Sequence, residues 1–253
     1  MQASAIAPDA ELIGHAQQLQ AELERRSGEI DQLRQLPQDL AEKLATLGFY
    51  RLVVPERLGG LGTSPDTFCE ICETLAMANG STAWCVFIGA TSQCLFGAVP
   101  PSHGKEMLAT RERSPGGVFA DSGTACAESR DGVAGYRING HWRWGSGCRN
   151  ARWISGGIHE VDQADEPVQR AAPLTRVFFR PEEIDIQDNW HVSGLRGSGS
   201  SDYIAEDVWV PAERMAGDVE DSIHARLPIY RFPKFALLGI PIGAICLGMA
   251  QAS

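Results

Sequence analysis

The sequence predicts an α+β fold, in which an all-helical N-terminal domain is followed by a middle domain that is a β barrel or sandwich. Apolar residues recur every three or four positions up to residue 113 and then alternate with a period of two over residues 114–215. A last apolar stretch, Phe235–Ala250, resembles a further helix. We therefore expect domains at 1–113 and 114–215, followed by a linker and the start of a C-terminal helical domain at 216–253.

The composition narrows the class of protein. With 253 residues, 43% of them hydrophobic and 21% charged, the chain is long and apolar enough to bury a sizeable core. Thirty-two acidic residues against 22 basic ones give a net charge of −10, which disfavours binding to nucleic acid. The start of the chain shows no signal-peptide pattern, and the odd number of cysteines, seven, indicates reduced thiols rather than disulfides. We expect a cytoplasmic protein.

Helical periodicity predicts five helices in the first domain. They begin, in order, at Asp9, at Leu36-Pro37, after a Ser64 cap, after a Ser81 cap and at Pro101. A short extended piece is expected at Phe49–Pro55. The fourth helix is apolar on all sides and should be buried. Cys69 and Cys72 fall on the apolar face of the third helix, and no second Cys or His pair completes a zinc site, so we expect packing and no metal.

Period-two alternation predicts the strands of the second domain. One strand carries Trp142 and Trp144, with a turn expected within it at Asn139-Gly140. The predicted strands are Gly116–Ala120, Gly135–Trp144, Arg152–Ile158, Thr175–Arg180 and Tyr203–Val210.

The apolar stretch Phe235–Ala250 raises the question of a membrane span. It is shorter than the roughly 20 residues that a bilayer core requires, and Pro241 and three glycines interrupt it. We therefore expect a packed helix and no membrane.

Four motifs, in order, resemble the acyl-CoA dehydrogenase superfamily. Ala45–Gly60 is similar to its opening segment, and the other motifs are similar to its flavin-dependent monooxygenase branch: Ser81–Trp84, Asn139–Gly147, and Trp190–Ser200 followed by Glu206–Pro211. That branch holds two-component hydroxylases of 4-hydroxyphenylacetate, of a steroid-derived phenol and of dibenzothiophene sulfur. The resemblance covers essentially the whole chain, which ends inside what resembles the first helix of the family's C-terminal bundle.

The resemblance implies a function. The protein would take reduced FMN or FAD from a separate flavin reductase and, through a C4a-hydroperoxyflavin, would oxygenate a small aromatic or heteroatom-containing substrate. The family also implies a homodimer or homotetramer. Two alternatives stay open: an acyl-CoA dehydrogenase that oxidises its substrate with FAD, and a catalytically silent relative that acts as a binding protein.

Trp144 and Ser146 are the leading candidates for cofactor contact. At positions i and i+2 of a strand they would share one face, where an indole can stack on a flat ring and a hydroxyl can hydrogen-bond its edge. The resemblance places Trp144 against the isoalloxazine and Ser146 at flavin N5. From the residues alone, a core tryptophan and a turn serine in a hairpin are the favoured interpretation of this pair, and the resemblance reverses that preference.

Two further segments supply candidates. Within Gly117–Thr124, the resemblance makes Ala120 and Ser122 candidates for contact with flavin and substrate, although a plain glycine-rich turn remains open. Arg196 and Ser198 belong to a Gly/Ser-rich loop that does not follow the strand-to-helix pattern of a phosphate cradle. We expect that loop to lie beside the flavin, with Arg196 either in a salt bridge or near the cofactor.

Ser92 occupies the position at which phenol hydroxylases of the resembled branch place a histidine. A neutral hydroxyl cannot take up a proton near neutral pH as imidazole can. Either the substrate needs no deprotonation or another residue serves, with His141 and His191 the nearest alternatives by motif.

Overall fold

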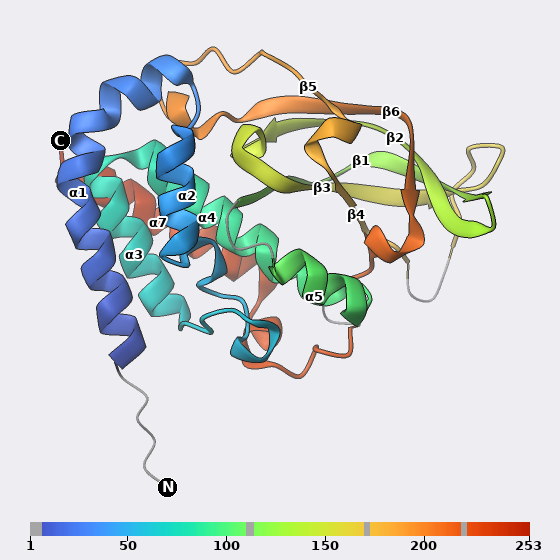
Figure 1. Cartoon of the computed structure of the whole chain (residues 1–253), viewed down its shortest axis with the longest axis horizontal. Helices are drawn as coiled ribbons and strands as arrows, with labels where there is room; N and C mark the ends of the chain where they lie inside the picture. Colours follow the sequence, from blue (N-terminus) through green and yellow to red (C-terminus); the bar gives the residue numbers. More distant parts are fainter. Residues whose placement is uncertain (1–6, 110–113, 170–172, 219–221) are drawn as a thin grey trace, which may run out of the picture.

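The computed structural model describes residues 7–109, 114–169, 173–218 and 222–253. A helical layer lies beside a curved sheet, and the last helix returns to the helical layer (Figure 1). The predicted α+β order is confirmed. The domain boundary predicted after residue 113 adjoins positions outside the described ranges, and β1 begins at Ser114.

The helices of the first domain follow the predicted order with three local differences. Asn79, not Ser81, caps the fourth helix: its Oδ1 accepts the Thr82 N–H at 2.9 Å, and Ser81 lies inside the helix. The segment predicted as extended contains a 3₁₀ turn at Phe49–Arg51, and the first helix runs seven residues past its expected end at Arg26. Ser64 caps the third helix as predicted. The bounds are α1 Ala7–Leu33, α2 Gln38–Thr46, α3 Pro65–Ala78, α4 Gly80–Cys94 and α5 Pro101–Ala109.

Helix α4 occupies the middle of the helical layer. Nearly all of its residues are buried, as its apolar character predicted, and Phe87 packs in the core with Phe68 of α3. Cys72 of α3 is also fully buried, and this burial raises the pKa of its thiol. Because α4 reaches the start of the sheet, its side chains can contribute to a site between the two layers.

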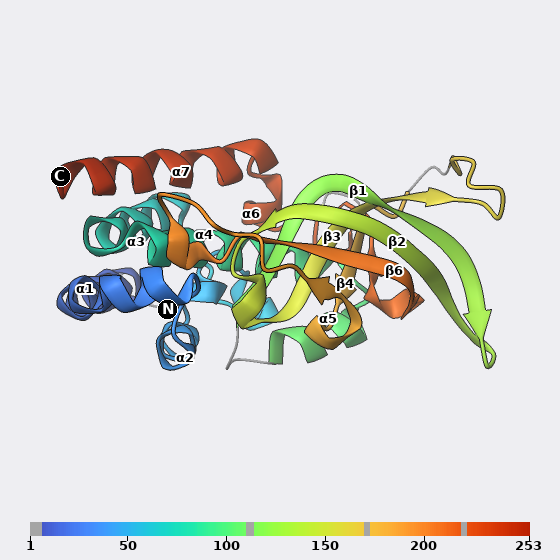
Figure 2. The ribbon, with the colours of Figure 1, turned by 90° about the horizontal axis from the view of Figure 1, so that it is seen from above.

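Helices α6 (Pro228–Arg231) and α7 (Lys234–Gln251) bring the chain back to the first domain. Figure 2 shows α7 lying along α3 and α4, on the side away from α2. A side chain at Gly248 would come within 2.3 Å of the Glu73 carbonyl oxygen, so α7 and α3 approach closely there. Among the described residues, α7 is the one helix long and apolar enough to cross a membrane. The close contact of α7 with α3 agrees with the expectation of a packed helix.

One mixed, strongly curved seven-stranded sheet forms the second domain (Figure 2). Its order is β5-β6-β2-β1-β3-β4-β7, with β1 and β3 parallel and the other pairs antiparallel. The strands are β1 Ser114–Arg130, β2 Val133–Gly145, β3 Ala151–Val161, β4 Arg176–Phe179, β5 Asp185–Ile186, β6 Ser201–Pro211 and β7 Met215–Ala216.

The hairpin turn between β1 and β2 lies at Asp131 and Gly132, whose φ values are +50° and +80°. The turn predicted at Asn139-Gly140 is wrong. Both residues pair within the ladder, opposite Thr124 and Gly123. An Asp-Gly pair satisfies the same left-handed turn geometry as Asn-Gly, so the sequence offered two equivalent turn sites.

Trp142 anchors the sheet's core. It is fully buried, its Nε1 donates to the Gly157 carbonyl at 2.8 Å, and its ring stacks on Tyr203 at 5.4 Å between centroids. A separate apolar cluster joins residues of the helical domain, such as Phe96, to Phe178 of β4. These contacts hold β4 against the segment that follows α4.

Candidate functional site

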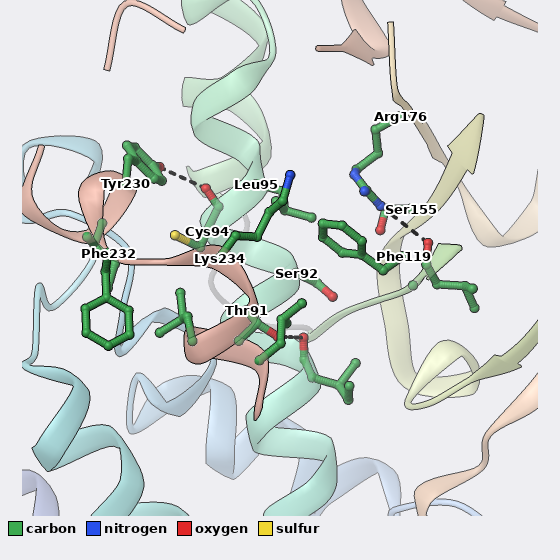
Figure 3. A pocket seen from close by; sticks show the side chains of 16 residues that line it. Thr91, Ser92, Cys94, Leu95, Phe119, Ser155, Arg176, Tyr230, Phe232 and Lys234 are labelled. Carbon is green, nitrogen blue, oxygen red and sulfur yellow. Dashed lines mark hydrogen bonds between the residues drawn. The ribbon is translucent and has the colours of Figure 1, made fainter. Parts of the chain in front are cut away.

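Two hollows meet where α4 faces the beginning of β1. They share the wall formed by Ile88, Gly117, Val118 and Phe119. The larger, about 410 Å³, is also lined by Trp84 of α4 and by residues from the end of β2 and the loop before β6: Arg143, Trp144, Ser146, Trp190, Leu195, Ser198 and Ser200. The smaller, about 110 Å³, lies between α4, β1, β4 and the start of α7 (Figure 3).

Trp144 and Ser146 both line the larger hollow, but not for the predicted reason. Trp144 has a φ of +64° and Ser146 lies just beyond the end of β2, so the alternation of a regular strand does not apply to them. The Ser146 N–H donates to the Trp144 carbonyl at 2.9 Å. The indole of Trp144 is 69% exposed, whereas Ser146 is only 5% exposed. The interpretation of Trp144 as a core residue is therefore wrong. The expectation that both residues share one face of a regular strand is wrong as well.

Asp202 fixes the backbone of Trp144. Its Oδ1 accepts the Trp144 N–H at 3.1 Å, and its Oδ2 lies 2.9 Å from His141 Nε2. Burial alone would raise the pKa of Asp202, but the hydrogen bonds from Trp144, His141 and Asn189 outweigh it and lower that pKa. The carboxylate is therefore charged at neutral pH and holds the left-handed turn that exposes the indole.

Ser146 belongs to a row of hydrogen-bonded hydroxyls that continues through Ser200 to Ser198. Trp84 Nε1 donates to Ser146 Oγ at 2.9 Å, Ser146 Oγ and Ser200 Oγ are 2.7 Å apart, and Ser200 Oγ and Ser198 Oγ are 2.7 Å apart. A serine hydroxyl has one donor and two acceptor positions, so these contacts leave Ser146 one further position. Trp84 and Ser200 are site residues that the sequence reasoning missed, although both belong to the quoted motifs.

The smaller pocket is mostly apolar, with a few polar groups on its walls. Ser92, predicted as a catalytic candidate, lies there on α4 and is 8% exposed. Ser155 of β3 and Arg176 of β4 lie on the opposite side (Figure 3). Sequence reasoning missed Arg176. The sequence feature that could have identified it is a single arginine directly before the apolar residues Val177–Phe179.

The remaining predicted residues are placed elsewhere. Ala120 and Ser122 are exposed on β1 and line neither hollow. Arg196 donates from Nε to the Asp31 carbonyl at 3.2 Å and from Nη1 to that of Val192 at 3.3 Å, and it also lies outside both hollows. Ser198 lines the larger hollow.

Neither histidine considered as a base reaches the hollows. His141 is paired with Asp202, and His191 Nε2 lies 3.3 Å from Arg34 Nη1 on the surface. Across the described ranges, no group of three or more His, Cys, Asp or Glu side chains is arranged to hold a metal ion.

An exposed indole beside a partly satisfied hydroxyl can stack on a flat heteroaromatic ring and hydrogen-bond its edge. The fold and these residues thus define the class of protein: an α+β protein with two adjoining hollows between its helical layer and its sheet. Residues 15–100 match the family described as acyl-CoA dehydrogenase, N-terminal domain. This part of the chain is therefore an acyl-CoA dehydrogenase N-terminal domain.

Its relatives lie in the monooxygenase branch. The chain is 31% identical to an indole-3-acetate monooxygenase of Acinetobacter baumannii, over 90% of this chain and 56% of the relative. It is 32% identical to the flavin-dependent monooxygenase oxygenase subunit HsaA of Rhodococcus jostii, over 91% of this chain and 60% of the relative. XiaF from Streptomyces sp., solved in complex with FADH2 and glycerol, superposes with a TM-score of 0.84 at 26% identity, over 96% of this chain and 61% of that one. The chain thus spans little more than half the length of these relatives.

Proposed function

We propose that the protein is the oxygenase component of a two-component, flavin-dependent monooxygenase. It receives reduced FMN or FAD from a separate reductase and uses O2 to oxygenate a small aromatic or heteroatom-containing substrate. The observation that carries this proposal is the pairing of exposed Trp144 with Ser146 at one hollow, next to an apolar pocket that shares its wall. The names of the relatives, an oxygenase subunit and monooxygenases, support it.

The larger hollow would hold the cofactor. Trp144 offers its indole face to the flavin ring, and Ser146 offers its remaining hydrogen-bonding position to the N5 edge. Ser198 acts through Ser200, because the row of hydroxyls fixes where the Ser146 oxygen lies. When bound, the reduced flavin supplies the electrons that activate O2.

The smaller pocket would hold the substrate. Its apolar side chains exclude water from the reacting atoms, and the wall formed by Val118 and Phe119 brings substrate and cofactor side by side. Ser92 can hydrogen-bond a substrate oxygen and orient it, but it cannot remove a proton near neutral pH. The protein therefore acts on substrates that need no deprotonation by this residue.

We also propose a cytoplasmic homodimer or homotetramer. The outer face of α7 leaves large apolar side chains exposed, among them Phe235, Ile240 and Leu247. Burial of these side chains against further protein would stabilise an assembly.

The test uses the purified protein, in the full length that its gene encodes, with chemically reduced FMN or FAD and a panel of phenols, indoles and thioethers. Oxygenated product is expected only when reduced flavin and O2 are both supplied. Ser146→Ala should lower the yield of product per flavin oxidised and release more hydrogen peroxide. Ser129→Ala, at an exposed serine far along β1, is the matched control.

Three outcomes would contradict the proposal. If the protein oxidised NADH without a reductase, the proposed two-component arrangement would be wrong. Anaerobic bleaching of a tightly bound FAD by an acyl-CoA would favour an acyl-CoA dehydrogenase. If Ser146→Ala changed no flavin-dependent property, the protein would be a catalytically silent relative that acts by binding.

A further inference from the structure

Arg176 is a buried cation without a carboxylate partner among the described residues. It is 5% exposed, at the start of β4. Its one hydrogen bond to a described residue runs from Nη1 to the Val118 carbonyl at 3.3 Å, and its guanidinium carbon lies 4.1 Å from the centre of the Phe119 ring. A guanidinium carries five N–H donors, so most of its donors are available to a ligand.

The surroundings of Arg176 do not neutralise it. Burial lowers the pKa of Arg176 to about 10, and the charge of Asp218 only partly opposes this effect. Asp218 is itself bound to Lys234, at 2.9 Å between Oδ1 and Nζ. A desolvated charge without a counter-ion is costly to keep in a folded protein. Its presence in a pocket wall indicates that a ligand brings the opposite charge.

The rest of the pocket lining indicates the size and the apolar character of such a ligand. Much of the remaining wall is aliphatic and includes Ile88 of α4, Leu95 just after α4 and Leu238 of α7. Cys94, Tyr230, Phe232 and Lys234 also line the pocket (Figure 3), and Lys234 is already paired with Asp218. Thr91 Oγ1 is already bound to the Phe87 carbonyl. The volume of about 110 Å³ is of the order of a cavity that accepts one benzene-sized ring, roughly 150 Å³.

We propose that Arg176 binds the carboxylate of a substrate whose remainder is a small apolar ring. Arginine is suited to this role because its planar fork can donate two parallel hydrogen bonds to one carboxylate. Phe119, which lies against the guanidinium, orients that fork and also forms the wall shared with the larger hollow. This inference names the substrate class of the same site and so rests on the proposed function.

The test compares two probes of nearly equal shape, phenylacetate and phenylacetamide, in calorimetric titrations of the 253-residue chain without flavin. The wild-type chain should bind phenylacetate about tenfold more tightly or better, because hydrogen bonds to charged groups exceed those to neutral ones. In Arg176→Met the two affinities should become equal. Arg180→Met is the matched control, because Arg180 follows β4 and stacks on Trp153 at 3.9 Å, outside the pocket. It should keep the preference.

Circular dichroism establishes that each variant is folded. If Arg176→Met does not fold, Arg176→Lys is used instead, because it keeps the charge but loses the planar fork. This variant should bind phenylacetate several-fold more weakly than the wild-type chain and bind phenylacetamide with unchanged affinity. Equal affinities in the wild-type chain, a preference that survives in Arg176→Met, or no binding of either probe at millimolar concentration would overturn the inference.

The outcome is separable from that of the proposed function. No flavin or O2 enters the titration, so a preference that depends on Arg176 would stand even if the full-length protein formed no oxygenated product. Conversely, flavin-dependent oxygenation of neutral substrates alone, with equal affinity for both probes, would refute the role of Arg176 and leave the oxygenase proposal in place.

Discussion

Replacement of Ser200 by alanine tests whether the row of hydroxyls behind Ser146 acts as one unit. Ser200 Oγ lies 2.7 Å from both Ser146 Oγ and Ser198 Oγ, so Ser200→Ala removes two buried hydrogen bonds at once. Ser146 keeps the bond from Trp84, whereas Ser198 loses its side-chain partner. One net hydrogen bond is worth about 1 kcal/mol, and an unsatisfied buried hydroxyl costs about 1–3 kcal/mol.

We therefore expect Ser200→Ala to lower the free energy of unfolding by about 2 kcal/mol. For a chain of this length, that corresponds to a fall in Tm of about 4–8 °C. Ser198→Ala removes one bond at the end of the row, so about 1 kcal/mol is expected. The double variant should cost less than the sum of the single ones, because it also removes the hydroxyl that Ser200→Ala leaves unsatisfied.

Urea denaturation followed by far-UV circular dichroism gives the three differences in free energy. Ser129→Ala, an exposed serine, should leave the free energy of unfolding within about 0.5 kcal/mol of the wild-type value. The reasoning fails if Ser198→Ala costs as much as Ser200→Ala, or if the double variant is additive.

Three other predictions concern the pH dependence of stability, the packing of α7 and flavin binding. Since the folded state lowers the pKa of Asp202 from its ordinary 3.8, its contribution to stability is full above about pH 4 and is lost as the pH falls through the folded pKa. Thermal melts should therefore show Asp202→Asn less stable than wild type at pH 7, with a gap that narrows in acid; a constant gap would contradict this. In Gly248→Ala the new methyl group would lie 2.3 Å from the Glu73 carbonyl oxygen, so Tm should fall by several degrees, whereas Gly243→Ala, with nothing within 4 Å, should not lower it. Fluorescence titration of the 253-residue chain with FMN and FAD should show weak binding or none, because we expect about half of the cofactor's pocket to come from the C-terminal bundle and a neighbouring subunit. A sub-micromolar Kd would refute that expectation.

Local patterns in the sequence determined the architecture. Apolar spacing of three and four residues placed the helices, and alternation placed most strands, because each pattern reports directly which face of an element is buried. The motif Asn139–Gly147 also identified Trp144 and Ser146 together as candidates for cofactor contact. Where two turn signals were equivalent, at Asp131-Gly132 and Asn139-Gly140, the sequence alone could not choose.

The tertiary structure decided how the site residues point and which of them meet. Trp144 is exposed because Asp202, on a neighbouring strand, holds its backbone in a left-handed turn that periodicity cannot report. Arg176 reaches the pocket of Ser92 because β1, β3 and β4 are neighbours in the sheet and α4 packs against β1. Such a meeting depends on long-range packing, whereas sequence patterns describe one element at a time.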